Sequence, residues 1–345
     1  MNNSIFRRLT ALVLGGVLLC APLAGCQTKP EPVQTTIFAM DTVMNLTIYG
    51  EQETLNQAVE RIYLLQNALD PNQEDSITYE LNHAGGERVP VSTGASGLLG
   101  PSLELCAVTG GALDLTAYSA VQAWGFSTGE YRVPDQAELD ELASRIDYTA
   151  LELADSTVRL PEGMAVDFGA VAKGYAGDLL ASQLTSAGVE HALLDLGQSS
   201  IQAIGAKPDG SPWRVGVQDP NGDRYLGVLE LADRGMGTSG SYQRYFEADG
   251  VRYCHIIDPD TAAPAQSGLA SVTVVSPSCL TCDGLSTALF VMGLEEGADF
   301  WRAHPELDFE AIFLTEDGSI AITAGLEDSF TLAEGYTDRE VTVLS

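Results

Sequence analysis

A carboxylate and a lysine lie six residues apart in the segment Val166–Asp178, V-D-F-G-A-V-A-K-G-Y-A-G-D. Asp167 ends an apolar run, Gly169 permits a tight turn, and Lys173 falls where a helix is expected to begin. Because a helix N-terminus exposes unpaired N–H groups at the positive end of the helix dipole, a lysine at that position forms a pocket for an anion. The segment therefore predicts a site for a phosphorylated ligand; the alternative is an ordinary structural lysine.

A second cluster of polar side chains that could do chemistry occurs in D-G-L-S-T, residues 283–287. In a helix, Asp283 and Thr287 share one face because they are four residues apart, and Ser286 lies beside them. One carboxylate with one or two hydroxyls is a ligand set that magnesium accepts while it keeps positions open for phosphate. The alternative is an N-cap aspartate followed by an incidental hydroxyl.

Two weaker motifs could add polar groups to such a site. In T-G-G-A-L-D-L-T (109–116) the paired glycines free the backbone for a ligand and Asp114 supplies a carboxylate, although for this motif alone a helix C-cap followed by a turn is the better explanation. In Y-C-H-I-I-D-P (253–259), His255 is expected in a strand, on the same face as Tyr253. A histidine can take a proton from a hydroxyl near neutral pH, but a lone histidine is more often structural.

The N-terminus indicates where the protein works. Arg7 and Arg8 precede the apolar run Leu12–Leu19, which is too short to span a bilayer and is typical of a signal peptide. The run leads to L-A-G-C, ending at Cys26, which resembles the lipobox of bacterial lipoproteins. That resemblance implies a signal peptide at 1–25 and a lipid on Cys26; ordinary secretion with an incidental cysteine is the alternative. Residues 26–34 would then tether a domain at 35–345 outside the cytoplasmic membrane.

The charge of the chain excludes one large class of partners. There are 17 basic and 48 acidic residues, a formal net charge of −31. Nucleic-acid binding needs a basic surface, so we expect no nucleic-acid partner. A phosphorylated ligand would be repelled at long range, and its site must therefore carry local positive charge from lysine, helix ends or a metal ion.

Four cysteines remain in the predicted mature domain: Cys106, Cys254, Cys279 and Cys282. The last two form C-L-T-C, but no second C-x-x-C or H-x3-H pair exists to complete a zinc site. A disulfide between Cys279 and Cys282 stays open in an oxidising compartment. We favour a non-catalytic role for the C-L-T-C pair over a redox pair.

The hydrophobic patterns predict strands and helices without a regular βαβ order. Strands are expected at 35–49, 192–204, 213–217, 225–231, 250–257, 270–275, 311–314, 320–323 and near Val341, and helices at 55–69, 97–108, 171–184 and 282–292. Residues 127–141 are expected to form a loop and 219–222 a hairpin turn. No G-x-G-x-x-G follows the first strand, which argues against a Rossmann fold.

The order of these motifs resembles the ApbE family, the FAD:protein FMN transferases. The resemblance rests on F-A-M-D-T-V, T-G-G-A-L-D-L-T, V-D-F-G-A-V-A-K-G-Y, L-L-D-L-G-Q, T-S-G-S-Y, H-I-I-D-P and D-G-L-S-T-A-L-F-V-M-G. It implies an α+β fold with mixed, mainly antiparallel sheets flanked by helices, and two lobes that enclose a flavin site. Members are often lipoproteins, which is consistent with Cys26.

The resemblance also implies a reaction and its residues. In this family FAD is the substrate, magnesium is the cofactor, a threonine or serine hydroxyl of a partner flavoprotein attacks the FMN phosphorus, and AMP leaves. The acceptor carries a short motif of the kind S/D-G-A/S-T. The matching positions would be Asp283, Thr287, Ser286 and the carbonyl of Ala170 for the metal, Met40, Ala112, Leu113, Asp114, Asp167, Lys173 and Ile257 for FAD, and His255 as the general base.

Two positions depart from the family pattern. Gln198 replaces the second glycine of the N-L-G-G that many relatives carry, and Asn72 stands where some relatives have an aromatic residue. Two other functions would use the same residues. One is a metal-dependent FAD pyrophosphatase, in which water replaces the acceptor hydroxyl, and the other is a lipid-anchored flavin-binding protein without catalysis.

Overall fold

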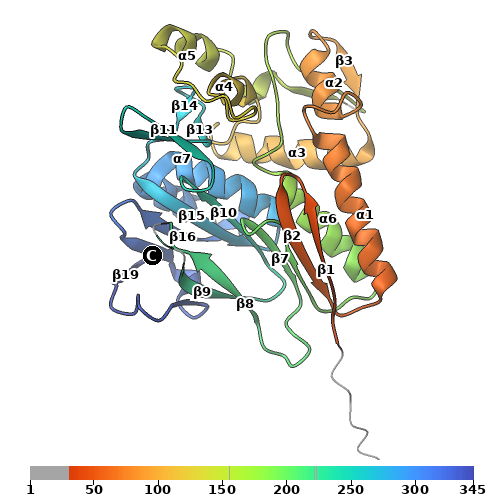
Figure 1. Ribbon diagram of the computed structural model, residues 1–345, viewed down its shortest axis with the longest axis vertical. Coiled ribbons are helices and arrows are strands. Elements are labelled where there is room, and N and C mark those ends of the chain that lie inside the picture. Colours follow the sequence, from red (N-terminus) through yellow and green to blue (C-terminus); the bar gives the residue numbers. More distant parts are fainter. Residues whose placement is uncertain (1–30, 155, 221, 223) are drawn as a thin grey trace, which may run out of the picture. The chain divides into compact units, whose positions relative to one another are not determined.

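The computed structural model describes residues 31–345, apart from residues 155, 221 and 223 (Figure 1). The predicted signal peptide (1–25) and the lipidated Cys26 lie outside the described residues. Residues Glu31–Ser345 form one compact unit, so the two lobes that we expected are parts of one domain. Its first strand begins at Val33, two residues inside the predicted tether. Among the described residues, no helix combines the length and the apolar character needed to cross a bilayer.

A nine-stranded sheet crosses this unit. Every neighbouring pair is antiparallel except β17 and β19, which are parallel. This arrangement confirms the predicted α+β fold with mainly antiparallel sheets. In spatial order the strands are β1 (Val33–Ala39), β2 (Thr42–Ile48), β6 (Ala192–Asp195), β7 (Ser200–Ile204), β10 (Gly235–Gly240), β15 (Leu269–Ser276), β16 (Glu310–Thr315), β17 (Ile320–Thr323) and β19 (Val341–Leu344).

Two of the predicted strands are in fact hairpins. Residues 35–49 fold back at Met40 and Asp41, whose φ angles are +49° and +57°. Residues 192–204 fold back between Asp195 and Ser200, with Gln198 at φ +67°. The single-strand prediction was wrong because apolar residues continue on both sides of each turn. At the first turn no glycine marks the left-handed backbone that a two-residue hairpin loop requires.

Smaller sheets surround the large one. They are β8 (Trp213–Gln218), β9 (Tyr225–Leu231) and β18 (Phe330–Leu332), then β3 (Arg88–Pro90), β5 (Thr157–Arg159) and β4 (Glu152–Ala154), and the hairpins β11 (Tyr245–Ala248) with β12 (Val251–Cys254) and β13 (Ile257–Asp258) with β14 (Ala263–Pro264). The turn predicted at 219–222 is closed by Gly222 N–H, which donates to the carbonyl of Asp219 at 3.2 Å. The strand predicted at 250–257 is interrupted after Cys254.

The helices are α1 (Gln52–Leu69), α2 (Ile77–His83), α3 (Thr93–Val108), α4 (Tyr118–Ala123), α5 (Gln136–Ala143), α6 (Ala172–Ser186) and α7 (Cys279–Ala303). The loop prediction for 127–141 was wrong in its last part because α5 begins there. The side chain of Asp135 caps this helix by accepting from Glu138 N–H at 3.0 Å. The N-cap signal was present in the sequence, but the polar composition of the segment hid it.

Helix α7 starts earlier and ends later than predicted. Its N-cap is Ser278, and Asp178 of α6 accepts from the N–H groups of Cys279 (2.7 Å) and Leu280 (3.1 Å). These bonds satisfy N–H groups that a helix start leaves unpaired, and they join two helices that are distant in sequence. Beyond Met292 the helix continues to Ala303 across a kink at Gly293, where φ is +82° and ψ is −178°.

Helices α6 and α7 approach each other closely at Gly174. A Cβ atom on this residue would lie 2.2 Å from the carbonyl oxygen of Cys279 in α7. We expect Gly174→Ala to lower the free energy of unfolding by about 3 kcal/mol, because backbone atoms would have to move apart. Gly94→Ala in the first turn of α3 is the control, since its Cβ would meet nothing nearer than 3.9 Å. The control should be neutral or stabilising by about 0.4–1 kcal/mol.

Urea denaturation of the domain from residue 31 onward measures both changes. Equal unfolding free energies for the two variants would contradict the close approach of the helices.

Candidate functional site

One cavity of about 1340 Å³ gathers the predicted site. All of the predicted site residues other than Cys26 line it, although they come from distant parts of the chain. They are Met40, Ala112, Leu113, Asp114, Asp167, Ala170, Lys173, His255, Ile257, Asp283, Ser286 and Thr287. The structure thus brings these residues together, while the role of each remains a prediction.

The carboxylate of Asp283 lies at the junction of α6, α7 and β7 and is only 6% exposed. Its Oδ2 accepts from Gly174 N–H at 2.7 Å, and its Oδ1 accepts from the Ser200 hydroxyl at 2.7 Å. Burial raises the pKa of this carboxyl, and the charge of Lys173 acts in the opposite direction. Each oxygen accepts a hydrogen bond from the protein and keeps acceptor capacity for a cation.

Asp283 is not an N-cap residue, because it lies in the second turn of α7. Two hydroxyls follow on the same helix. Ser286 Oγ donates to the carbonyl of Asp283 at 2.9 Å, and Thr287 Oγ1 lies 3.3 Å from the same carbonyl. Since their hydrogens are directed back at the helix, both oxygens present lone pairs away from it.

Ser239 on β10 faces these hydroxyls. Its Oγ lies 2.9 Å from Ser286 Oγ and 3.1 Å from Thr287 Oγ1. Sequence reasoning missed both Ser239 and Ser200 as site residues. Ser239 belongs to T-S-G-S-Y, which entered only as a family motif, and Ser200 follows the D-L-G-Q turn with no signal of its own.

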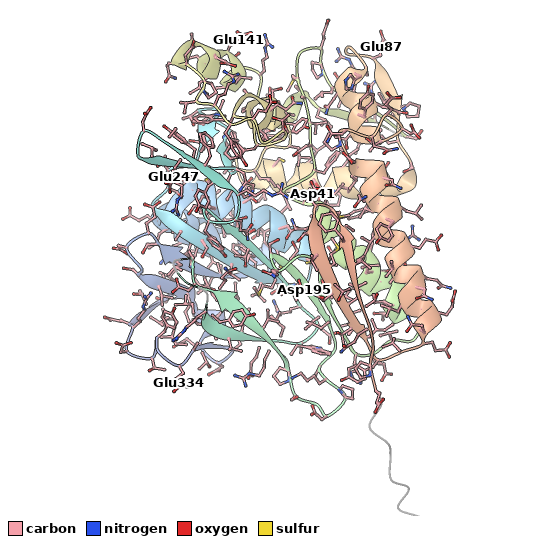
Figure 2. All side chains as sticks on the ribbon, in the orientation of Figure 1. Asp41, Glu87, Glu141, Asp195, Glu247 and Glu334 are labelled. Atoms are coloured by element: carbon pink, nitrogen blue, oxygen red, sulfur yellow. The ribbon has the colours of Figure 1, made fainter. Side chains whose placement is uncertain are left out.

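The charge of the cavity favours an added cation. Six aspartates line it against Lys173, Arg214 and Arg244, which leaves a formal surplus of three negative charges. Two of those aspartates, Asp41 and Asp195, are labelled in Figure 2, which also shows the other labelled acidic side chains spread over separate elements. No group of three or more histidine, cysteine, aspartate or glutamate side chains that could hold a metal occurs in the described part of the chain. A metal here would be bound mainly by oxygen atoms, as hard cations are.

Lys173 is the second residue of α6, as predicted. The start of this helix already binds an anionic group of the protein itself, because the N–H of Gly174 donates to the carboxylate of Asp283. The lysine charge also lowers the pKa of His255, so this ammonium acts on both groups. Its positive charge is thus available at the point where a phosphate would meet Asp283.

His255 lies in a bend between β12 and β13, and the prediction that it lies within a strand was wrong. Its Nδ1 is 3.2 Å from the carbonyl of Arg244. Because a carbonyl can only accept, Nδ1 carries the hydrogen and Nε2 keeps a free electron pair. Burial, and then the charge of Arg244, lower the pKa of His255 to about 4. The ring is therefore neutral at pH 7 and can accept a proton.

Two other carboxylates of the cavity are held differently. Asp114 accepts from Thr116 N–H and hydroxyl at 2.7 and 2.6 Å and from Tyr148 N–H at 2.8 Å. Burial raises its pKa, and it raises the pKa of Asp167 to about 6. The preceding T-G-G does form a helix C-cap, at Thr109 of α3, as the alternative reading proposed. The same loop also lines the cavity.

Both departures from the family pattern lie on the cavity wall. Gln198 adopts a left-handed conformation, held by Asp195, whose Oδ1 accepts from the N–H groups of Gly197 (3.1 Å) and Gln198 (2.6 Å). Gln198 thus adopts a backbone conformation that glycine would adopt without strain. Asn72 lies across the cavity, and its N–H donates to Asp70 at 2.8 Å.

The four cysteines of the described part are buried and free, so the disulfide between Cys279 and Cys282 that the sequence allowed is not formed. Burial raises the pKa of both thiols well above the usual value. Neither is a thiolate at neutral pH, which fits the expectation of a non-catalytic role.

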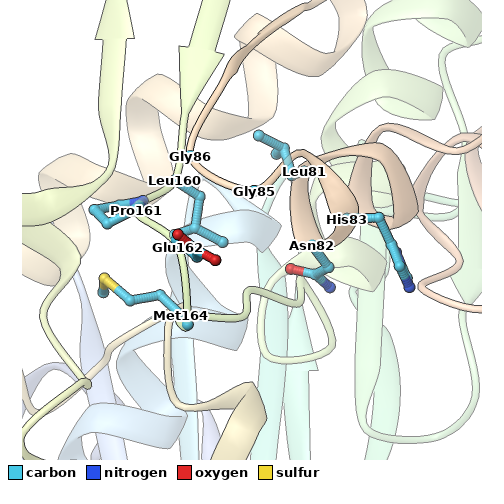
Figure 3. A pocket seen from close by; sticks show the side chains of 10 residues that line it. Leu81, Asn82, His83, Gly85, Gly86, Leu160, Pro161, Glu162 and Met164 are labelled. Atoms are coloured by element: carbon cyan, nitrogen blue, oxygen red, sulfur yellow. The ribbon is translucent and has the colours of Figure 1, made fainter.

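A smaller cavity of about 170 Å³ lies next to Asn82, between α2 and the segment that leads to Asp167 (Figure 3). The Asn82 amide donates to the carbonyl of Val166 at 2.9 Å and accepts from its N–H at 2.7 Å. Both polar atoms of this side chain are used in holding the backbone next to Asp167. Asn82 thus holds part of the wall of the main cavity, and we assign no separate site to the smaller cavity.

Comparisons with known proteins agree with this arrangement. The ApbE family profile matches residues 40–313. The FAD:protein FMN transferase of Vibrio cholerae is 34% identical over 311 residues, covering 86% of this chain and 92% of the relative, and that of Treponema pallidum is 32% identical over 342 residues, covering 91% and 94%.

Solved structures of similar proteins have the same fold. The crystal structure of the ApbE protein from Thermotoga maritima has a TM-score of 0.79 at 28% identity and covers 90% of this chain and 100% of its own. The apo flavinyl transferase ApbE from Pseudomonas stutzeri gives the same TM-score and identity, with 89% and 99% coverage.

The lowered pKa of His255 predicts a pH dependence of stability. Between pH 6.5 and pH 4 the unfolded chain protonates this histidine while the folded protein does not, so its contribution to stability is lost as the pH falls. We expect His255→Gln to remove this loss. Relative to wild type, the variant should gain about 1–2 kcal/mol of unfolding free energy from pH 7 to pH 4.5, a figure reduced for solvent access. Asp167 titrates with the opposite sign in both proteins and cancels in the difference. Parallel pH curves in urea denaturation would refute the shift.

Proposed function

Because this chain belongs to the ApbE family, the FAD:protein FMN transferases, we propose that it transfers FMN from FAD to a serine or threonine hydroxyl of a partner flavoprotein with the aid of magnesium. The observation that carries the proposal is that the buried Asp283 and the Ser286 and Thr287 hydroxyls of the same helix line one cavity with His255. In the reaction, the hydroxyl oxygen forms a bond to the FMN phosphorus, the bond from that phosphorus to the diphosphate bridging oxygen breaks, and AMP leaves with that oxygen.

The donor set fits magnesium. We propose that Asp283, Thr287 and the carbonyl of Ala170 hold the ion, with Ser286 beside them. The aspartate and hydroxyl oxygens face the cavity with electron pairs available, and the surplus negative charge of the wall favours a divalent cation. When bound, magnesium neutralises diphosphate charge and makes the phosphorus easier to attack.

The protein's own groups do the remaining work. Lys173 stabilises the charge that develops on the phosphates, because its ammonium lies at the start of α6 beside Asp283. Nε2 of His255 takes the proton of the acceptor hydroxyl, since Nδ1 is fixed by Arg244. Contacts to FAD are assigned to the remaining cavity-lining residues of the family motifs: Met40, Ala112, Leu113, Asp114, Asp167 and Ile257.

Removal of the Asp283 carboxylate tests the proposal. We expect Asp283→Asn and Asp283→Ala to lower the transfer rate at least about 100-fold, because the main charged ligand of the metal is lost. The asparagine keeps the size of the side chain and guards against misfolding. Asp338→Ala, an exposed aspartate before β19, is the control and should keep full activity.

The measurement uses FAD, magnesium and a folded flavoprotein domain with a surface S-G-A-T sequence. Wild type should add an FMN-sized mass to that domain and release an equal amount of AMP. EDTA should stop the reaction and magnesium should restore it. AMP with free FMN and no labelling would favour the pyrophosphatase, and intact FAD throughout would favour a binding protein. Full activity in Asp283→Asn would refute the metal assignment.

We also propose that the protein is anchored outside the cytoplasmic membrane by a lipid on Cys26. The support is the L-A-G-C sequence after a basic and apolar start. The full chain, expressed in a bacterium, should partition into the detergent phase of Triton X-114, and its N-terminal peptide should carry the lipid mass. Cys26→Ser should move the protein to the aqueous phase, whereas Cys20→Ser, within the signal, should not. Wild-type protein in the aqueous phase with an unmodified Cys26 would contradict the anchor.

A further inference from the structure

An aromatic surface lies beside the proposed base. The segment after α4 contributes Phe126 and Tyr131, and the β11–β12 hairpin contributes Phe246 and Tyr253; we call these four rings the aromatic ledge. The elements α4, α5, β11, β13 and β14 lie at the upper left of Figure 1. Beneath the rings, Trp124 belongs to a small core of its own and donates to the carbonyl of Ala262 at 2.9 Å.

The rings of the ledge are fixed by stacking on one another. Tyr131 stacks on Phe246 with centroids 4.9 Å apart and planes 13° apart, and Phe246 stacks on Tyr253 at 5.2 Å and 23°. Tyr253 in turn lies 5.0 Å from the ring of Trp124. Aromatic side chains held in this way lose little further freedom when a partner binds, so they suit a docking surface.

The ledge is continuous with the catalytic cavity. Phe126 lines that cavity, and its ring stands edge-on to His255 with centroids 6.5 Å apart. Gln243 and Arg244, which lead into the hairpin, line the cavity as well and are exposed. A protein whose hydroxyl reaches Nε2 of His255 must therefore lie over or beside these elements.

The ledge and its borders expose large apolar side chains to solvent. Tyr131 and Val133 are 46% and 48% exposed, and Val251, on the same face of the hairpin as Phe246 and Tyr253, is 42% exposed. Single exposed apolar residues need no explanation, but a group of them next to a catalytic group marks an interaction site. Phe38 and Tyr225 are more exposed, but they line the cavity itself, from β1 and β9, and belong to its wall rather than to this hairpin.

Two ion pairs border the ledge. Arg132, the residue after Tyr131, forms an ion pair with Glu138, and on the opposite face of the hairpin Arg252 pairs with Glu247 and covers the ring of Tyr245 at 4.3 Å. Each pair neutralises one acidic side chain in a chain of net charge −31.

We propose that the aromatic ledge is the docking surface for the folded domain of the acceptor protein, which presents its serine or threonine hydroxyl to His255. This inference rests on the proposed transferase function. The ledge recognises the partner by an apolar, aromatic-binding patch next to the modified residue, and the cavity itself needs to admit only that residue and its neighbours.

The test replaces exposed residues that lie outside the catalytic cavity. The double variant Tyr131→Ser, Val251→Lys should raise KM for a folded flavoprotein domain with a surface S-G-A-T sequence at least about tenfold, as loss of an aromatic anchor does. Its KM for FAD should stay unchanged. Transfer to a short synthetic peptide with the same S-G-A-T sequence should also stay unchanged, because the peptide reaches His255 without the ledge.

The matched control is Tyr63→Ser, Val343→Lys, which makes the same chemical changes at exposed sites on α1 and β19. It should behave as wild type, and equal melting temperatures would show that both variants fold. If the wild type labels neither substrate, the proposed function itself is contradicted.

Labelling by the wild type with an unchanged KM for the domain in the ledge variant would overturn the docking proposal alone. An equal rise of KM for domain and peptide would also overturn it, because the substitutions would then act on the cavity. So would a change in mass by light scattering without a change in KM, since the ledge would then join two copies of this chain.

Discussion

The buried carboxylate of Asp283 is the constraint around which the rest of the site is arranged. Its oxygens are bonded by Gly174 of α6 and Ser200 of β7, so a single side chain of α7 ties two helices and the sheet together. A buried charge is costly unless it is hydrogen-bonded and compensated, and here the compensation comes from these donors and from Lys173. The close approach requires glycine at 174 and also at 237, where a Cβ would lie 2.5 Å from the backbone of Cys282.

Burial acts on the titratable groups of the cavity in a way that lowers its total charge. It raises the pKa of Asp114, Asp167 and Asp283 and lowers that of His255. The histidine is therefore a neutral base, and a bound cation would favour the ionised form of the carboxylates. A dianionic diphosphate bound next to these carboxylates would add to the repulsion between negative charges. We therefore expect the metal and the substrate each to raise the affinity of the site for the other.

The sequence predicted those parts of the site that depend on local spacing. That Asp283, Ser286 and Thr287 share a helical face follows from the 3.6-residue period of the helix alone. That Lys173 lies at the start of a helix follows from the turn that precedes it. The sequence-based prediction failed where a tertiary hydrogen bond decides the local structure. Helix α7 starts at Cys279 because Asp178, about a hundred residues earlier, accepts from its first N–H groups. The same reason explains why Ser200 and Ser239 escaped notice: each matters only through a partner on α7.

The separation of cores bears on how such an enzyme could serve different acceptors. The helices that carry the proposed metal ligands pack into the largest hydrophobic core, around Leu285 and Phe313, whereas the aromatic ledge packs on a separate small core around Trp124. None of the four ledge rings belongs to the core that holds α6 and α7, so substitutions of the exposed ledge residues leave the glycine-dependent fit of these helices intact. His255 is the residue at which the two parts meet, since its backbone belongs to the hairpin and its ring faces the cavity. Partner choice can therefore change through the ledge while the position of the base relative to the phosphate is kept by the bend that follows β12.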